Sequence, residues 1–381
     1  MASTTTTLPT SIKELKSAPT PHEIHGRTLW EPFVPFFASH GITLWNAGEN
    51  ASMSPPDDRV RAPDGFFYRM VQPWDPSFFH RGGFSLRLPT VCPGRTTDGR
   101  DVVIRITSIG DDCAQHRIAL ERLATGNVAT LIGNHTVPVL QWLTLENITF
   151  AVQPMLSWED PTSEYCYEDV EDLLSTMVQM LEGVAFCHSK LVAHLDLWEG
   201  NFLCNYFGDR GPARFSTHDR TKVVPPFRST FPFKVYIIDF ESCVLFDEAS
   251  DPSTHVHSGP PPGFDIKKYA RIKYPELLSD APYNPFLVDV WQLGVRFKCL
   301  FAGCTEEPDD LEEPDIPWAE GEGPEDMEPP VPFKSLPAAV VALVERMTAE
   351  DPAERPTAAV ALAELRSIFS KLSKDELRAL V

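Results

Sequence analysis

The hydrophobic residues of this 381-residue chain recur at helical spacing in several long segments. The strongest pattern lies in residues 167–190 (YEDVEDLLSTMVQMLEGVAFCHSK), where one apolar stripe returns every three or four positions. Similar patterns occur in residues 287–301 (LVDVWQLGVRFKCLF), 336–347 and 357–372. The spacing therefore predicts one long helix near the middle of the chain and three more in its C-terminal third.

Strand patterns occur mostly before and between these helices. Residues 101–109 (DVVIRITSI) alternate between apolar positions and a second set that includes Arg105, which predicts a strand with one buried face. A short helix should follow in residues 110–126, with Asp111 and Asp112 at its start and Gly126 at its end. Shorter strands are predicted from the runs FAVQPML, LVAH, NFLCN and KVYIIDF. The chain is thus a mixture of helices and strands.

Three segments lack such patterns. Residues 1–26 are rich in Thr, Pro and Ser, which predicts a flexible tail. Residues 27–84 are aromatic and broken by prolines, which predicts an ordered extension of short strands and turns packed on a core. Residues 305–330 contain many acidic residues and no Lys or Arg, which is typical of a solvated, mobile insertion.

Charge and cysteine usage narrow the class of protein. The net charge of −21, from 33 basic and 54 acidic residues, argues against nucleic acid and anionic membranes as main partners. The 8 cysteines form no C-x-x-C pair, so reduced thiols in the cytoplasm or nucleus are expected. The N-terminus has no apolar signal segment and no run approaches a membrane span, so we expect a protein that is not secreted and not embedded in a membrane.

The segment HLDLWEGN, residues 194–201, carries the candidate chemistry. Phosphoryl transfer needs one carboxylate to orient the attacking hydroxyl, and oxygen ligands that hold Mg²⁺ on the phosphates. Asp196 and Asn201 stand five positions apart in this segment, and Asp239 follows the strand VYII. A carboxylate at the end of a buried strand is costly unless it is paired or binds a metal. The alternative is that all three residues only form turns and caps.

These segments together resemble a protein kinase domain, in particular the divergent kinase-like proteins numerous in basidiomycete fungi. The resemblance covers residues 101–372. HLDLWEGN resembles the catalytic loop, DFE stands in place of D-F-G, and the segments YPE, DVWQLG and DPAERPTA occur in the family's order. The resemblance implies an α+β, two-lobed protein-kinase-like fold. Its small β-rich N-lobe would span residues 85–155, with the extension 27–84 packed on it, and its larger helical C-lobe residues 156–381.

The resemblance also implies roles for individual residues, with ATP and Mg²⁺ as the bound cofactors. Asp196 would orient the acceptor hydroxyl as a catalytic residue, while Asn201 and Asp239 would hold the metal. The nucleotide would be contacted by Val103, Arg105, Gln153, Met155 and Leu203. The structural set would be His194, Phe240, Glu276, Asp289 and Arg355. Within that set, Glu276 and Arg355 would form a buried ion pair and Asp289 would brace the catalytic loop.

The sequence departs from the family pattern at several positions. Arg105 replaces the lysine that grips the phosphates, although it could also be an arginine on an exposed strand face. His116 stands where that lysine's glutamate partner is expected, and no G-x-G-x-x-G segment precedes the strand. Weak ATP affinity follows from the missing glycine loop. Leu195 replaces an arginine that normally pairs with a phosphorylated loop, and Trp198 replaces a lysine and should pack over the loop.

Three functions remain open. The first is a protein kinase-like phosphotransferase that moves the ATP γ-phosphoryl group to Ser or Thr of a protein. The second is a pseudokinase that binds partners, favoured by Arg105 and the missing glycine loop. The third is a small-molecule kinase of the aminoglycoside or choline type, opposed by the YPE, DVWQLG and R-P segments. The acceptor and any protein partner are not specified by the sequence.

Overall fold

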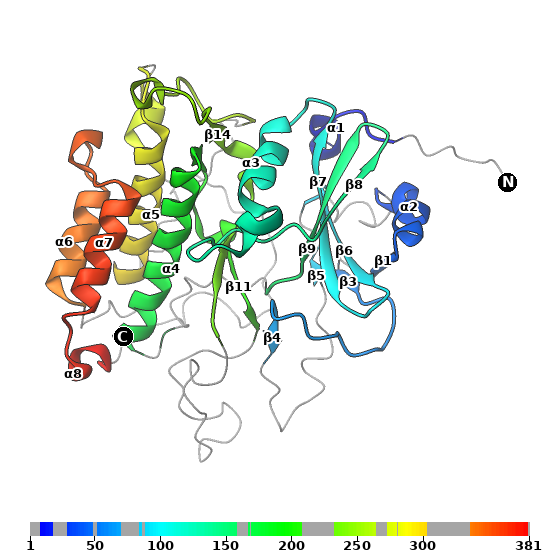
Figure 1. Cartoon of the computed structure of the whole chain (residues 1–381), viewed down its shortest axis with the longest axis horizontal. Helices are drawn as coiled ribbons and strands as arrows, with labels where there is room; N and C mark the ends of the chain where they lie inside the picture. The colour runs from blue at the N-terminus through cyan, green and yellow to red at the C-terminus, as the bar shows by residue number, and fades with distance from the viewer. Residues whose placement is uncertain are drawn as a thin grey trace, which may run out of the picture. The chain divides into compact units, whose positions relative to one another are not determined.

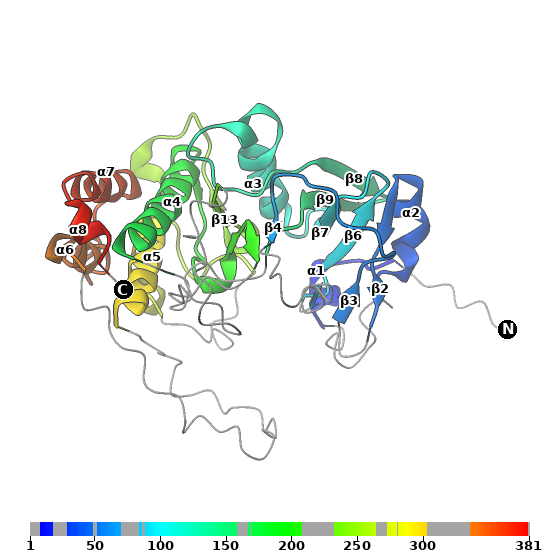
Figure 2. The same cartoon turned by 90° about the horizontal axis from the view of Figure 1, so that it is seen from below.

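A computed structural model of the chain forms two compact units (Figures 1 and 2). The first consists of Met1–Glu159 and Leu203–Gly208, and the second of Asp160–Phe202 and Asp209–Val381. The structure describes residues 8–17, 29–48, 52–69, 84–85, 88–157, 167, 169–207, 232–263, 273–279, 281–302 and 336–379. The predicted acidic insertion 305–330 lies outside these residues. Because the first unit is rich in strands and the second in helices, the predicted α+β class is confirmed.

The first unit is built on a five-stranded sheet in the order β1-β6-β7-β9-β8. Its strands are β1 (Ile42–Leu44), β6 (Val91–Thr96), β7 (Asp101–Ile109), β8 (Gln141–Leu145) and β9 (Ile148–Pro154). All neighbouring pairs are antiparallel, and Val103 of β7 lies opposite Gln153 of β9. Helix α3 (Ala114–Ala124) packs against β7 and is followed by the 3₁₀ turn η2 (Gly126–Thr130). The predicted strands at 101–109 and 150–156 are therefore present.

The segment that was predicted to be an extension forms part of this sheet. After η1 (Glu31–Phe33) and α2 (Val34–Ser39), the chain enters β1, which is the edge strand beside β6. The strands β2 (Asn46–Ala47), β3 (Ser52–Ser54) and β5 (Phe84–Ser85) make a second, three-stranded sheet. A third pair joins β4 (Tyr68–Arg69) to β12 (Tyr206–Phe207). Residues far apart in the sequence are thus tied together within the first unit.

The N-terminal tail is ordered over a short stretch, which corrects the prediction that residues 1–26 are flexible. Helix α1 (Ile12–Ser17) buries Ile12 and Leu15 in the hydrophobic core of the first unit. The Asp112 carboxylate accepts a hydrogen bond of 2.7 Å from the backbone N–H of Ile12. Asp112 therefore caps α1, and it does not cap α3 as predicted, because α3 begins after Cys113.

Strand β7 is buried on both faces, so the expectation of one exposed face is wrong. Ile104 and Ile106 join the aromatic core that contains Trp30, Phe33 and Phe150, among others. On the opposite face Arg105 is only 7% exposed and Thr107 is fully buried. Helix α3 packs against the strand as well, and within β7 only Val103 is partly exposed.

The second unit is a group of helices packed side by side (Figures 1 and 2). They are α4 (Val170–Ser189), α5 (Pro285–Ala302), α6 (Ala338–Met347), α7 (Ala358–Phe369) and the short α8 (Lys374–Leu377). The Asp169 side chain caps α4 by accepting the N–H of Asp172 at 2.9 Å. A Cβ at Gly294 of α5 would lie 2.8 Å from the Met347 side chain, so glycine permits the close approach of α5 to the end of α6.

Short strands and turns complete the second unit. The strand β10 (Val192–Ala193) pairs with β14 (Val244–Leu245), and β13 (Val235–Ile237) leads into the DFE segment. The strand β11 (Phe202–Cys204) begins in the second unit and ends in the first. The 3₁₀ turns are η4 (Glu199–Asn201), η6 (Phe240–Ser242), η7 (Pro252–Thr254), η8 (Pro275–Leu278) and η10 (Pro352–Glu354). In the described part of the chain no helix is long and apolar enough to cross a membrane.

Candidate active site

The loop that carries Asp196 is fixed by a buried carboxylate on α5. Asp289 is fully buried and accepts two backbone N–H bonds from the loop, from His194 at 2.8 Å and from Leu195 at 2.7 Å. His188, in the last turn of α4, lies 2.8 Å from the same carboxylate through Nε2. A buried carboxylate needs such donors to offset its lost hydration. The predicted bracing contact between Asp289 and the loop backbone is therefore present.

Asp196 and Asn201 are hydrogen-bonded to each other. The Nδ2 of Asn201 donates to the Asp196 backbone carbonyl at 2.8 Å and to the Asp196 carboxylate oxygen Oδ2 at 2.9 Å. Asn201 is buried and Asp196 is half-buried. Because the amide nitrogen is directed at Asp196, the amide oxygen Oδ1 is the atom that Asn201 offers to a cation.

Ile238 ties this loop to the segment that contains Asp239. Its backbone N–H donates to the Asn201 carbonyl at 3.0 Å, and its own carbonyl accepts from His194 Nε2 at 2.8 Å. The other ring nitrogen of His194 accepts the N–H of Asp196 at 3.3 Å. Asp239 is the next residue, so the two predicted metal ligands, Asn201 and Asp239, lie in neighbouring, directly bonded segments.

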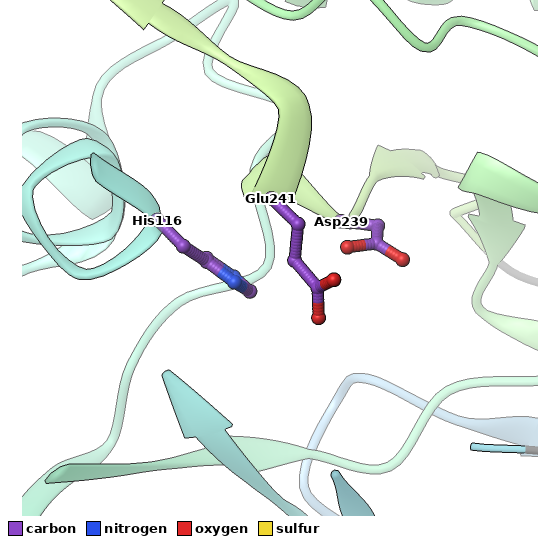
Figure 3. Close-up of side chains that lie close together, drawn as sticks. All are labelled: His116, Asp239 and Glu241. Carbon is purple, nitrogen blue, oxygen red and sulfur yellow. The ribbon is translucent and has the colours of Figure 1, made fainter. Parts of the chain in front are cut away.

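Asp239 sits at a turn that brings two carboxyl groups together (Figure 3). Its backbone is left-handed, with φ of 67°, and it caps the 3₁₀ turn η6. Figure 3 shows the Asp239 and Glu241 side chains side by side, with oxygens within 4.8 Å of each other. Phe240, between them in sequence, points into the core and its ring centre lies 4.8 Å from that of His194. His116, also drawn in Figure 3, comes from α3 of the first unit.

The side chains at this turn and in the neighbouring loop offer carboxylate and amide oxygens. Carboxylate and amide oxygens are the ligand types that Mg²⁺ prefers. The donor set formed by Asn201 Oδ1 and the Asp239 carboxylate therefore fits a hard divalent cation.

The predicted ion pair between Glu276 and Arg355 is present in the second unit. Arg355 Nη1 lies 2.6 Å from Glu276 Oε1, and Nη2 lies 3.2 Å from Oε2. The remaining N–H groups of Arg355 donate to the backbone carbonyls of Ala349, Leu287 and Glu350. All five donors of the guanidinium are thus used, which makes this pair part of the architecture of the unit.

The residues predicted to contact nucleotide all belong to the first unit. Arg105 lies opposite Ala151 and is buried, so the alternative of an arginine on an exposed strand face is wrong. Val103 and Leu203 are half-buried. Two acidic residues near His116 have other partners, since Asp112 accepts from the N–H of Ile12 and Glu121 pairs with Arg117.

Gln153 and Met155 are held by contacts inside the first unit. The Gln153 carboxamide donates to the Val137 carbonyl at 2.9 Å. The Met155 N–H donates to the Asp101 carbonyl at 3.2 Å, and its own carbonyl accepts from Arg61 Nη2 at 2.8 Å. The N–H of Met155 is therefore already bonded within the unit, while its carbonyl oxygen and its side chain can still contact a nucleotide base.

Sequence reasoning missed two residues that support the site. Arg61, in the extension, contacts Met155 across 94 positions, and no local pattern indicates this contact. Gln292 contacts the catalytic loop from α5, and the available signal was its position three residues after Asp289, which places both on one face of the helix. The packing of Trp198 over the loop was foreseen, since its ring atom Cη2 would lie 2.6 Å from a Cβ at Gly200.

Comparison with known families identifies a large part of the chain. A family model described as "Protein kinase domain" matches residues 119–365, which is more than half of the chain. The match contains Asp196, Asn201, Asp239, Glu276 and Asp289, and it begins after Arg105. No curated protein matches the chain.

Proposed function

The chain belongs to the protein kinase domain family, and on that premise we propose that it transfers the γ-phosphoryl group of ATP to a hydroxyl of a Ser or Thr side chain in a protein. Family membership supports a kinase-like phosphotransferase. The acceptor class and the residue roles are our proposal. The single observation that carries it is the bonded arrangement of Asp196, Asn201 and Ile238–Asp239.

Asp196 is assigned to the acceptor hydroxyl. Its Oδ2 accepts from Asn201, and its backbone N–H and carbonyl are held by His194 and Asn201. A carboxylate fixed in this way orients the hydroxyl by accepting its proton in a hydrogen bond. The hydroxyl oxygen then forms a bond to the γ-phosphorus, the bond to the bridging oxygen of ADP breaks, and the hydroxyl proton passes to Asp196.

Asn201 and Asp239 are assigned to the metal. When bound, Mg²⁺ neutralises charge on the phosphates. Asn201 contributes its Oδ1, because its Nδ2 is committed to Asp196. Asp239 contributes its carboxylate. The residue before it, Ile238, is hydrogen-bonded to the loop through both its N–H and its carbonyl.

Arg105 is assigned to the phosphates, and Val103, Gln153, Met155 and Leu203 to the base. A guanidinium keeps the positive charge of the usual lysine but is planar and bulkier. No contact is assigned to the Met155 N–H, since it already donates to the Asp101 carbonyl. We therefore expect nucleotide binding that is weaker than is usual for the family.

The test is a thermal-shift and turnover experiment. A ligand that binds only the native state raises the melting temperature, so ATP with Mg²⁺ should raise it more than ATP alone. Asp196→Ala should abolish turnover but keep the thermal shift, because Asp196 is not assigned to the metal. Asp239→Ala should lose the part of the shift that depends on Mg²⁺. Asp375→Ala, an exposed acidic residue in α8, is the matched control and should behave as wild type.

One alternative is supported by a specific observation. Arg105 is buried in β7 in place of lysine, which favours a pseudokinase that binds partners without transferring phosphate. Absence of any nucleotide-induced shift at millimolar ATP would favour this alternative. Turnover that survives in Asp196→Ala would remove that residue from the reaction.

A further inference from the structure

A carboxamide on α5 spans the peptide groups on either side of Asp196. Gln292 is 5% exposed. Its Oε1 accepts the N–H of Leu197 at 3.0 Å, and its Nε2 donates to the carbonyl of Leu195 at 3.1 Å. One side chain therefore fixes the residue before Asp196 and the residue after it.

The backbone at this point needs such support. Leu195 has φ of 62°, in the left-handed region that side chains other than glycine rarely adopt. A residue in this conformation persists only when its surroundings hold it there. Asp289 holds the N–H of Leu195 and Gln292 holds its carbonyl, so both peptide groups of the strained residue are anchored to the same helix.

The supporting residues form a row along α5. Asp289, Gln292 and Arg296 are spaced by three and four positions, which places them on one face of the helix. Arg296 Nη1 continues the row by contacting Glu199 Oε2 at 3.1 Å. The loop is therefore held at three successive points, and Gln292 is the middle one, next to Asp196.

We propose that Gln292 is a positioning residue that sets the direction of the Asp196 carboxylate for phosphoryl transfer. This inference rests on the proposed function, in which Asp196 orients the acceptor hydroxyl. Gln292 acts through the backbone of Leu195 and Leu197 and does not touch the reacting atoms. If it served only to fill space, an apolar side chain of similar size would serve better, because a buried carboxamide is costly unless both of its ends are bonded.

The decisive variant is Gln292→Leu, which keeps the bulk and removes both bonds. A displacement of about 1 Å at a catalytic group can lower turnover about 100-fold. We expect kcat for ATP turnover to fall between about 10- and 100-fold, with KM for ATP changed less than about threefold, since no nucleotide contact is removed. Gln292→Glu retains an oxygen for the Leu197 N–H but cannot donate to the Leu195 carbonyl, so it should not restore kcat.

The matched control is Gln179→Leu in α4. Gln179 makes the same kind of contact elsewhere in the unit, accepting the N–H of Val235 at 3.0 Å and donating to the Phe233 carbonyl at 3.5 Å. Gln179→Leu therefore removes a carboxamide that bonds two backbone groups but removes no hydrogen bond to the loop. Its kcat should stay within about twofold of wild type.

Amide hydrogen exchange, resolved by residue, gives a readout that does not require activity. In Gln292→Leu the Leu197 amide should exchange at least about tenfold faster, while the amides of His194 and Leu195, which Asp289 holds, change less than about threefold. Unchanged exchange at Leu197 would overturn the inference, and so would an equal rise at all amides of the unit.

The same data separate failure of this inference from failure of the proposed function. Wild-type protein without ATP turnover would refute the proposed function, while the exchange pattern would still decide whether Gln292 positions the loop. An active wild type with unchanged kcat in Gln292→Leu would refute the inference alone.

Discussion

The contact between Glu276 and Arg355 allows the effect of one substitution on stability to be worked out from the structure. Arg355→Met removes a guanidinium whose side chain is fully buried and whose five N–H groups are all bonded. It leaves the Glu276 carboxylate, which is only 9% exposed, without its cation. The second unit should therefore lose stability mainly through an uncompensated buried charge.

The expected magnitude is large compared with total stability. Removing one partner of a buried ion pair typically costs about 3–5 kcal/mol. Whole domains are stable by about 5–15 kcal/mol, so a large part of the stability would be lost. The double variant Glu276→Gln with Arg355→Met should lose less than Arg355→Met alone, because no buried charge remains.

The assay is native-state amide exchange of the slowest amides in α4, which reports the opening of the second unit separately from the first. Arg346→Met is the control, because Arg346 pairs with Glu364 at the surface, where such a pair contributes about 0–1 kcal/mol. Equal losses for Arg355→Met and Arg346→Met would show that burial of the pair does not determine its contribution.

Three further predictions follow from other contacts. Leu15→Ala should destabilise the first unit by about 2–5 kcal/mol, measured by exchange in β7, because Leu15 is buried in its core; an unchanged rate would mean that α1 is not docked in solution. Gly200→Ala should lower turnover about tenfold by displacing Trp198, and adding Trp198→Ala should restore part of it, as steady-state kinetics would reveal. Burial, assisted by neighbouring carboxylates, raises the pKa of Tyr283 above its usual value of 10.0, so the neutral phenol stabilises the fold. That stability is fully present below pH ~10 and is lost as the pH rises through the higher folded-state pKa. The melting temperature of Tyr283→Phe should therefore fall less steeply with rising pH than that of the wild type.

The elements that depend on local pattern were predictable. The apolar stripe of residues 167–190 predicted a helix, and α4 spans Val170–Ser189 with that stripe buried. The sequence HLDLWEGN also predicted that Asp196 and Asn201 point toward one place, and their side chains are hydrogen-bonded to each other. Patterns of this kind succeed because the interacting residues are neighbours in the chain.

Errors arose where burial depends on a distant segment. The tail was expected to be flexible, yet Leu15 is buried because a core built from later strands receives it. A local signal existed, since Ser11 Oγ accepts the N–H of Glu14 in the spacing of a helix N-cap. The exposed face expected for β7 was also wrong, because the covering of Arg105 and Thr107 is a property of the packed sheet and not of the strand.

The supports of the candidate site were harder to find than the site itself. Asp196 and Asn201 lie within six residues, but Gln292 reaches Leu197 across 95 positions and Leu195 across 97. The resemblance to the kinase family indicated that Asp289 braces the loop, whereas the contact of Gln292 with the loop was found only in the structure. The three-residue spacing from Asp289 to Gln292 places both on one face of α5, but it does not indicate which distant backbone groups Gln292 contacts.

Arg105 and the residues assigned to phosphoryl transfer lie in different units. Arg105 lies in the first unit, outside the matched region, whereas Asp196, Asn201 and Asp239 lie in the second unit and are all retained. Their loop is held by α5 at Asp289 and again at Gln292. On the proposed roles, substitution at Arg105 should act mainly on KM for ATP, because Arg105 is assigned to ATP binding. Substitution at Gln292 should act on kcat, because Gln292 is assigned to the positioning of Asp196.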